Sequence, residues 1–576
     1  MLQGNIPGIP ANVGAYIRQG QPNELVEVIV KFTGDIARVA ASVGGVAELL
    51  SDNFAIVTLP LGQLIPLYAY PEIEYVELPT TLTFVLSRSL SHACITYVQS
   101  DFGFALRGDG VLIGIIDSGI DYTHPDFRNP DGTTRIAFLW DQSIDGAPPA
   151  GFLHGTEYTA AEINAALQAT DPYSIVPSRD NIGHGTAVAG IAAGNGRASQ
   201  GVQVGAAPQA TLAVVKLGDI DDRATTRSTQ IMRGIRYLYD KAEQLNMPLS
   251  LNLSYGTNFG AHDGNSLFES YIDDMADLGQ SVISVATGNE GAAGHHFSGR
   301  VLEDGQVTVE FSTSGLVNEI YMPVWKNFVD TFSYELISPS GRTTGEILPV
   351  QSAVNVILDN VQVDLYFGQP THYQLAQENY FRFRGVSGRP IPQGVWTLII
   401  RGLDIVDGNF DIWMPTADVV SAGTAFLQPD TSVTLTIPST AQNVISVGGY
   451  NSLIGTSAEF SGRGDTRFIV FTKPDLVAPA VAITTARAGG GYDTFTGTSM
   501  AAPFVTGAAA LMMQWGIIQG NDPFLYGQRA KAFLQKGARR EQAIAFPNTI
   551  WGYGTLCLNN TMNLLVEYLQ RGGPSA

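Results

Sequence analysis

Cysteine is nearly absent from this sequence of 576 residues, which contains only Cys94 and Cys557. Two cysteines are too few for a disulfide-stabilised small domain or a cysteine-based metal site, but they leave open a single bridge between themselves. Long apolar runs are also missing, because no stretch approaches the roughly 18 apolar residues that a membrane helix needs. Residues 1–18 lack the basic segment and apolar core of a secretory signal. These absences predict a soluble protein that is not exported by the conventional route.

Positive charge is scarce as well. The chain has 32 Lys and Arg residues against 53 Asp and Glu residues, which gives a formal net charge of −21 at pH 7. Proteins that bind nucleic acid need a basic footprint, so this balance argues against a nucleic-acid partner. The chain is too long for one ordinary hydrophobic core, so two or three domains are expected.

A serine near the C-terminal end stands in a context suited to nucleophilic chemistry. Ser499 follows the small residues Gly497 and Thr498 and precedes the apolar run 501–515, which predicts a buried helix. The hydroxyl would then lie at a helix N-terminus, where free backbone N–H groups stabilise negative charge. A serine hydroxyl alone is a poor nucleophile, so a base and an orienting acid are needed elsewhere in the chain.

Both partners are found upstream. The apolar run 111–116 predicts a buried parallel strand that leads into Asp117. His184 stands between two glycines at the start of the small-residue segment 181–190, which predicts a helix. With these three motifs in the order Asp, His, Ser, the chain resembles the subtilisin-like serine proteases. The resemblance implies that Ser499 is the nucleophile, that His184 is its general base and that Asp117 orients the histidine.

Strands and helices alternate through the centre of the chain. The sequence has strand-like runs at 211–217, 249–254 and 281–286. Between the first two runs, apolar positions recur at helical spacing from residue 231 to residue 245. This order predicts right-handed crossovers and an α/β fold with a doubly wound parallel sheet. Ligands of such sheets bind at the carboxyl ends of the strands.

Two loops at these strand ends carry the remaining candidate site residues. Asn289, in the sequence Thr-Gly-Asn-Glu-Gly, resembles the family's asparagine that stabilises the oxyanion of acyl transfer, with the Ser499 backbone N–H as second donor. An isolated Asn-Glu-Gly is usually a surface turn, but the strand before it favours the catalytic interpretation. The residues that resemble the family's substrate-binding walls are Ser254, Tyr255, Gly256, Thr287 and Gly288.

No metal ion or other cofactor is predicted. Asp126 occupies a position that binds calcium in some relatives, but the loop 194–205 offers no obvious set of oxygen ligands to complete a site. Asp121 and His124 belong to the same motif as Asp117, and both are assigned to the loop rather than to catalysis.

The chain departs from a minimal subtilisin in two places. Residues 1–86 show a β-α-β-β-α-β pattern that resembles the family's propeptide, which chaperones folding, occupies the substrate cleft and would be cut off between about Leu82 and Ser89. An ordinary N-terminal domain is the alternative. Residues 300–430 alternate with period two and predict an inserted β-sandwich, most simply a jelly roll. The catalytic domain then comprises residues 87–299 and 431–576.

This layout resembles the Csp germination proteases of spore-forming Clostridia, in which the propeptide stays bound and the enzyme activates a cortex-hydrolase zymogen. The resemblance implies a protein of the spore cortex or coat; otherwise a cytoplasmic or non-classically secreted protein is expected. Two other functions are compatible with the motifs: a general degradative protease, and a pseudoprotease scaffold that binds without cutting. The intact residues Asp117, His184, Ser499 and Asn289 favour an active enzyme.

Overall fold

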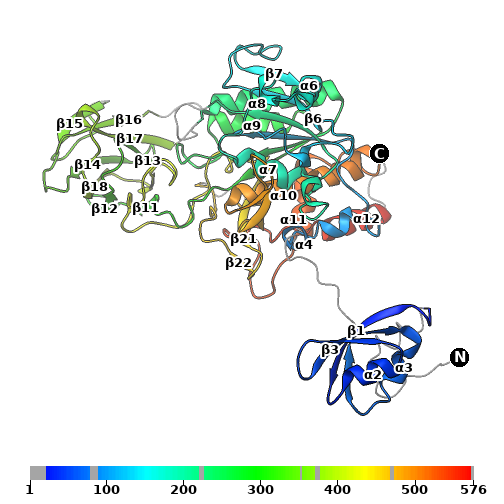
Figure 1. Ribbon diagram of the computed structural model, residues 1–576. Coiled ribbons are helices and arrows are strands. Elements are labelled where there is room, and N and C mark those ends of the chain that lie inside the picture. The colour runs from blue at the N-terminus through cyan, green and yellow to red at the C-terminus, as the bar shows by residue number, and fades with distance from the viewer. Residues whose placement is uncertain are drawn as a thin grey trace. The chain divides into compact units, whose positions relative to one another are not determined.

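The computed structural model describes residues 21–77, 88–218, 226–350, 353–369, 376–467 and 472–571. The chain divides between residues 85 and 86 into two compact units (Figure 1). The expected lead-in at residues 1–20 and most of the predicted autocleavage segment, residues 82–87, lie outside the described residues.

The N-terminal unit is a four-stranded antiparallel sheet with two short helices, in the β-α-β-β-α-β order that the sequence predicts. Its elements are β1 (Leu25–Phe32), α2 (Ile36–Ser42), β2 (Val46–Leu49), β3 (Phe54–Pro60), α3 (Leu64–Leu67) and β4 (Ile73–Glu77). The strands lie in the order β2-β3-β1-β4. Val26, Val28 and Val30 of β1 are all buried, because alternate residues of a strand point to the same face. The unit therefore has a hydrophobic core of its own.

A nine-stranded sheet forms the centre of the second unit, in the order β22-β21-β10-β9-β5-β8-β6-β7 with β23 beside β21. The bounds are β5 (Leu112–Asp117), β6 (Ile136–Asp141), β7 (Thr156–Thr159), β8 (Thr211–Lys216), β9 (Leu249–Leu253), β10 (Ser281–Ala286), β21 (Ile445–Asn451), β22 (Thr456–Ser457) and β23 (Leu476–Pro479). Strands β7 and β22 pair antiparallel and the other pairs are parallel. The predicted α/β class, with a largely parallel sheet, is confirmed.

Helices cover both faces of this sheet (Figure 1). On one face lie α4 (Arg88–His92), α5 (Thr96–Gln99), α6 (Ala160–Gln168), α7 (His184–Ala193), α10 (Thr498–Met513), α11 (Gly527–Gly537) and α12 (Leu558–Gln570); on the other lie α8 (Ser228–Leu245) and α9 (Leu267–Ala276). Within β5, Ile113 and Ile115 join the first core, and Leu112 and Ile116 join the second. A strand buried on both faces has to be apolar throughout, which is why β5 reads as a continuous apolar run.

Helix α10 runs through the first of these cores. Its residues from Met500 to Met513 are buried, and a π-helix continues it from Gln514 to Ile518. In the described part of the chain, Thr498–Ile518 is the one helical stretch long and apolar enough to cross a bilayer, with a mean hydropathy of 1.4, and 89% of its most apolar window is buried inside the unit. A helix that is apolar all round is also typical of the core of a large domain.

The inserted region forms two antiparallel sheets that share one hydrophobic core. Their orders are β11-β19-β13-β17-β16-β15 and β14-β18-β12-β20. The strands are β11 (His296–Arg300), β12 (Gln306–Thr313), β13 (Glu319–Asn327), β14 (Thr331–Ile337), β15 (Ala353–Leu358), β16 (Val361–Phe367), β17 (Ala376–Gly385), β18 (Gly394–Asp404), β19 (Asn409–Trp413) and β20 (Ala425–Phe426). Aromatic side chains fill the core, among them Phe311, Phe381 and Trp396. The inserted all-β domain is confirmed, while its jelly-roll connectivity stays a prediction.

A disulfide bond joins the beginning and the end of the second unit. Cys94, just after α4, is bonded to Cys557, which precedes α12, and their Cα atoms are 4.7 Å apart. Backbone hydrogen bonds reinforce this junction, since the Leu558 N–H donates to the Ala93 carbonyl at 3.0 Å. The single disulfide bond that the sequence analysis allowed is therefore present. It anchors the first helices of the unit to α12.

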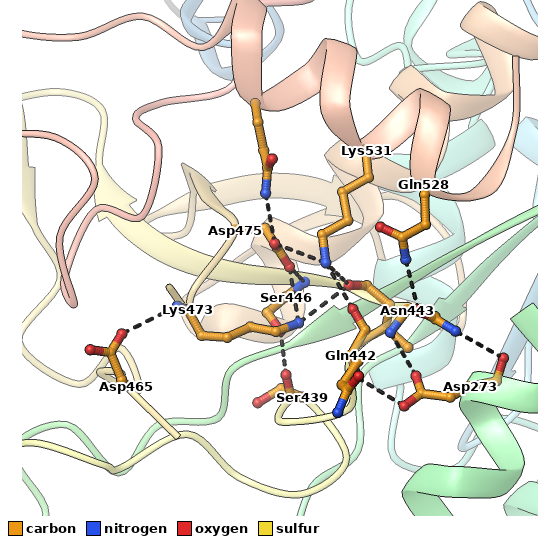
Figure 2. A network of polar contacts seen from close by, with 12 residues as sticks. Asp273, Ser439, Gln442, Asn443, Ser446, Asp465, Lys473, Asp475, Gln528 and Lys531 are labelled. Atoms are coloured by element: carbon orange, nitrogen blue, oxygen red, sulfur yellow. Dashed lines mark hydrogen bonds and ion pairs between the residues drawn. The ribbon is translucent and has the colours of Figure 1, made fainter. Parts of the chain in front are cut away.

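A buried network of charges lies where β21 and β23 begin (Figure 2). Asp475 is 2% exposed and is paired with two lysines: its carboxylate lies 3.1 Å from Lys473 Nζ and 3.0 Å from Lys531 Nζ. It also accepts a hydrogen bond of 2.8 Å from the Ser446 N–H. Lys531 belongs to α11, so the network ties this helix to the strands that enter the central sheet.

Candidate active site

Asp117 and His184 meet at the carboxyl edge of the central sheet. Asp117 is the last residue of β5 and is fully buried, while His184 is the first residue of α7 and is partly exposed. A hydrogen bond of 2.7 Å joins His184 Nδ1 to Asp117 Oδ1. The same carboxylate oxygen accepts from the Ser118 N–H at 2.7 Å. The imidazole is therefore held with Nε2 directed away from the carboxylate.

Close packing of α7 on β5 makes this contact possible. A Cβ atom at Gly185 would lie 2.1 Å from the Gly119 carbonyl oxygen and 3.0 Å from Asp117 Cβ. Gly183, which caps the helix, has a φ of +83°, a conformation that favours glycine. The approach of the helix to the strand thus requires Gly185, and the left-handed backbone before the helix favours Gly183.

Asp180 fixes the start of the same helix and was not identified from the sequence. It is 7% exposed, and its two carboxylate oxygens accept from the Gly183 N–H and the Thr186 N–H, each at 2.8 Å. Its Oδ1 also accepts from Ser118 Oγ at 2.8 Å. A carboxylate at a helix N-terminus satisfies N–H groups that have no partner inside the helix. An aspartate shortly before a helix start is the local signal that could have indicated it.

The pKa of His184 reflects two opposing effects. Burial lowers it, whereas the Asp117 carboxylate raises it by its charge and by the hydrogen bond, and Asp180 and Asp418 add further negative charge. The net effect is a pKa above the ordinary value of 6.5. Histidine has to be neutral to accept a proton, so the imidazole becomes available as a base as the pH rises through this pKa.

Ser499 lies at the start of α10, where the sequence predicts it. Its Oγ is 3.5 Å from the Ser254 carbonyl oxygen, and Ser254 Oγ is 3.3 Å from the Ser499 carbonyl oxygen. Among the residues that the structure describes, no hydrogen bond joins Ser499 Oγ to His184. Helices α7 and α10 pack against each other, so the serine and the histidine lie in the first turns of two adjacent helices. Proton transfer requires the hydrogen bond between them to form when a substrate binds.

Asn289 is held in one orientation beside the serine. Its Oδ1 accepts from the Thr498 N–H at 3.0 Å and from Thr498 Oγ1 at 3.2 Å. With the oxygen engaged, the amide nitrogen is the end that can donate to a ligand. A Cβ atom at Gly497 would lie 3.4 Å from that nitrogen, so glycine at this position keeps its surroundings open.

A pocket of about 90 Å³ opens beside Ser499. Of the predicted wall residues, it is lined by Ser254, Tyr255, Gly256 and Gly288, together with Asn289. Thr287 does not line it, because this residue is fully buried behind the wall and its N–H donates to the Val447 carbonyl at 3.1 Å. Ala286, Thr498 and Ser499 also line the pocket, as do five residues that were not among the predicted site residues: Glu290, Thr416, Ala417, Asp418 and Thr436.

The other polar residues of the Asp117 motif serve its loop. Both carboxylate oxygens of Asp126 are engaged within the protein, by the Ala198 N–H and by the Tyr492 hydroxyl, each at 2.8 Å. His124 Nε2 is hydrogen-bonded to the Gly491 carbonyl at 2.9 Å, and Asp121 Oδ1 accepts from the Thr123 N–H at 3.0 Å. Both oxygens of Asp126 therefore accept hydrogen bonds from donors of the protein itself.

Two family models match the sequence. The subtilase family model matches residues 108–318 and 411–554, and the Csp protease B prodomain model matches residues 14–80. The unmatched stretch between the two subtilase segments falls within the inserted sandwich.

Individual relatives give a consistent result. The structure of the Clostridium perfringens CspB protease is similar over 83% of this chain and 97% of that chain, with a TM-score of 0.77 and 39% sequence identity. The PIII-type proteinase of Lactococcus lactis subsp. cremoris is 24% identical over 495 residues, which are 76% of this chain and 23% of that protein. Subtilisin E of Bacillus subtilis is 29% identical over 189 residues, which are 32% of this chain and 36% of that protein. The chain thus spans about a quarter of the length of the lactococcal proteinase it matches.

Proposed function

The chain belongs to the subtilase family of serine peptidases, and from this membership we propose that Asp117, His184 and Ser499 form its catalytic triad. The hydrogen bond of 2.7 Å between His184 Nδ1 and Asp117 Oδ1 carries the proposal. It involves a histidine with a raised pKa at the start of one helix, next to the helix that has the serine in its first turn. Asn289 and the pocket beside it complete an arrangement suited to cutting peptide bonds.

The mechanism follows from these positions. Ser499 Oγ attacks the carbonyl carbon of the scissile bond while His184 Nε2 takes the hydroxyl proton, and the histidine then gives this proton to the leaving amine. Asp117 keeps the proton on Nδ1 and stabilises the imidazolium that forms in between. The oxyanion accepts hydrogen bonds from the Asn289 side chain and from the Ser499 backbone N–H at the N-terminus of α10. Water then attacks the acyl-enzyme while His184 Nε2 takes a proton from it, and the histidine returns this proton to Ser499 Oγ as the acid product leaves.

Replacing Asn289 by alanine is expected to lower kcat by roughly 100- to 1000-fold, because one fixed donor to the oxyanion is lost. KM should change little, since the bond forms only as negative charge develops. Steady-state hydrolysis of a short peptide measures both constants. Asn560, an exposed asparagine of α12, gives a matched control, and unchanged turnover in Asn289→Ala would rule out its oxyanion role.

The N-terminal unit is proposed to be a propeptide that the catalytic part removes and then retains in its cleft. The match of residues 14–80 to a Csp protease prodomain supports this proposal. The similarity to a Csp protease supports a further step, in which the enzyme cuts one partner protein, a cortex-hydrolase zymogen, during spore germination. A location in the spore cortex or coat belongs to the same proposal.

Two other functions make different predictions. A general degradative subtilase digests casein broadly, whereas an activator of one zymogen cuts casein little. A pseudoprotease scaffold cuts neither, and its binding survives Ser499→Ala. The Asp117–His184 contact favours an active enzyme over the scaffold.

Self-processing tests the proposal directly. Wild-type protein is expected to separate on a denaturing gel into a small fragment, the size of the N-terminal unit, and a large one, whereas Ser499→Ala stays whole. Ser174→Ala, an exposed serine, should process like wild type. Mass spectrometry of the small fragment identifies the bond, and co-elution of both fragments on a sizing column shows that the propeptide is retained. If wild type also stays whole, the scaffold becomes the better explanation.

A further inference from the structure

The pocket beside Ser499 has a floor made by Thr436, which lies between its two glycine-bearing walls. A Cβ atom at Gly256 would be 2.2 Å from Thr436 Oγ1, and one at Gly288 would be 2.5 Å from the same oxygen. The Thr436 backbone is fixed in this place, since its N–H donates to the Thr287 carbonyl at 3.0 Å. The residues just after it lead into the buried network, where Ser446 Oγ donates to the Ser439 carbonyl (Figure 2).

The hydroxyl of this threonine has no partner within the described residues. Thr436 is 2% exposed, and its Oγ1 is buried without a hydrogen bond. Native proteins seldom leave a buried hydroxyl unpaired, because the group has lost its water without gaining a partner. A substrate side chain that reaches the floor of the pocket can supply the missing bond.

Asp418 brings a negative charge to the same pocket. The preceding Ala417 N–H donates to Glu290 Oε1 at 3.0 Å, while Glu290 Oε2 accepts from His295 Nδ1 at 2.6 Å. Glu290 is 4% exposed and both of its oxygens are engaged, so it anchors the loop that carries Asp418 rather than facing a ligand. This loop joins β19 to β20 of the inserted domain.

The charge of Asp418 is not balanced within the pocket. Asp418 is exposed, and no lysine or arginine lines the pocket among the residues that the structure describes. Its field reaches across the site, because it contributes to the charge that acts on His184. The pocket therefore combines an unpaired hydroxyl at its floor with a free carboxylate in its lining.

We propose that this pocket selects a P1 residue, the residue on the N-terminal side of the cut bond, whose unbranched side chain ends in an N–H group, as in lysine or glutamine. The inference rests on the proposed endopeptidase function and names its substrate class. The N–H group donates to Thr436 Oγ1, and Asp418 attracts a positive charge and repels a carboxylate. Methionine has a similar length but leaves the threonine hydroxyl unpaired, and glutamate places a second negative charge near Asp418.

Four peptides that differ only at P1, with lysine, glutamine, methionine or glutamate, test the proposal on the self-processed protein. Covalent labelling of Ser499 with a fluorophosphonate counts the active sites. We expect kcat/KM for the lysine and glutamine peptides to exceed that for methionine about tenfold, with glutamate cut most slowly. If the methionine peptide is cut as fast as the glutamine peptide, the P1 proposal is overturned while the endopeptidase function stands. The same holds if labelled enzyme cuts none of the four peptides. A protein that neither processes itself nor reacts with the fluorophosphonate would overturn the endopeptidase function itself.

Two conservative variants separate the two contributions. Thr436→Val keeps the shape of the side chain and is expected to erase the preference for glutamine over methionine. Asp418→Asn is expected to reduce the preference for lysine over glutamate about tenfold and to leave the glutamine-to-methionine ratio unchanged. Asp274→Asn, on the exposed side of α9, is the control and should alter neither ratio. Ratios within one variant do not depend on how much of it is folded, so unchanged ratios in both pocket variants would contradict the assignment.

Discussion

Asp117→Asn is expected to slow peptide-bond cleavage by roughly 10⁴-fold, the loss typical of this change in a serine-protease triad. The carboxylate accepts from His184 Nδ1 at 2.7 Å and so keeps the proton on that nitrogen. An amide cannot accept at one end without offering N–H groups at the other, so the histidine no longer has one defined tautomer. The rate of self-processing after refolding provides a readout in which each molecule turns over once.

The same variant has a second, independent signature in its pH profile. Asp117 raises the pKa of His184, while burial lowers it. Loss of the carboxylate charge therefore lowers the pKa, and the acidic limb of the rate profile should move to lower pH. Asp131→Asn, an exposed aspartate in a nearby loop, should leave both rate and profile unchanged. If Asp117→Asn kept a tenth of the wild-type rate, or an unshifted profile, its assigned role would be wrong.

The elements that carry the proposed triad can be predicted from the sequence because each has a local physical cause. A strand buried on both faces has to be apolar throughout, so the run before Asp117 identifies β5. Helix α10 is buried on all sides, so Ser499 stands before an unbroken apolar segment. His184 is marked by two glycines, one that a close helix–strand contact requires and one that a left-handed backbone conformation favours. Burial thus determines these patterns residue by residue.

The inserted domain shows where local patterning stops being informative. Apolar and polar residues alternate along strands β12, β14, β16, β17 and β18, and this period-two pattern predicts them. Strand β13 does not alternate, because residues 322–326 are all buried. Trp325 of this strand packs with Ala261 of the catalytic part, and its neighbours pack inside the sandwich. Contact on both sides replaces the alternation that would have identified the strand.

The pocket could not be predicted beyond its two walls for a related reason. Asp418 lies between the sandwich strands β19 and β20, and Thr436 follows β20, both far along the chain from the walls at Gly256 and Gly288. Neither residue stands in a motif of its own. Their place depends on how the chain returns from the insertion, which Glu290 fixes through the Ala417 N–H. Such pairings across long separations leave no pattern in a local window.

The buried network at the start of β21 and β23 arises in the same way, and it leads to the largest expected effect on stability. Asp475 is the counterion of both Lys473 and Lys531. Lys473 is 1% exposed in its side chain and also donates to Ser446 Oγ at 2.9 Å. Burial lowers the pKa of Lys473 from 10.5 to about 8, although the Asp475 charge acts in the opposite direction. Removing the aspartate would leave two buried ammonium groups without a partner of opposite charge.

Asp475→Asn is therefore expected to lower the free energy of unfolding by about 3–5 kcal/mol, the usual effect of breaking a buried ion pair from one side. Chemical denaturation in a Ser499→Ala background measures it without self-digestion. Glu319→Gln is the control, because Glu319 pairs with Arg382 at 2.7 Å on the surface and should contribute less than about 1 kcal/mol. A loss no larger than in this control would show that the network is not a major source of stability.

The pH dependence of that loss gives a further check on its cause. Without Asp475 the pKa of Lys473 falls below about 8, so the folded variant binds fewer protons than the folded wild type between the two pKa values. The unfolded chains bind the same number, since lysine then titrates at its ordinary pKa. The stability difference between wild type and variant should therefore shrink as the pH rises from 6.5 to 9. A difference that stayed constant over this range would point to lost hydrogen bonds, such as the one from the Ser446 N–H, rather than to an uncompensated charge.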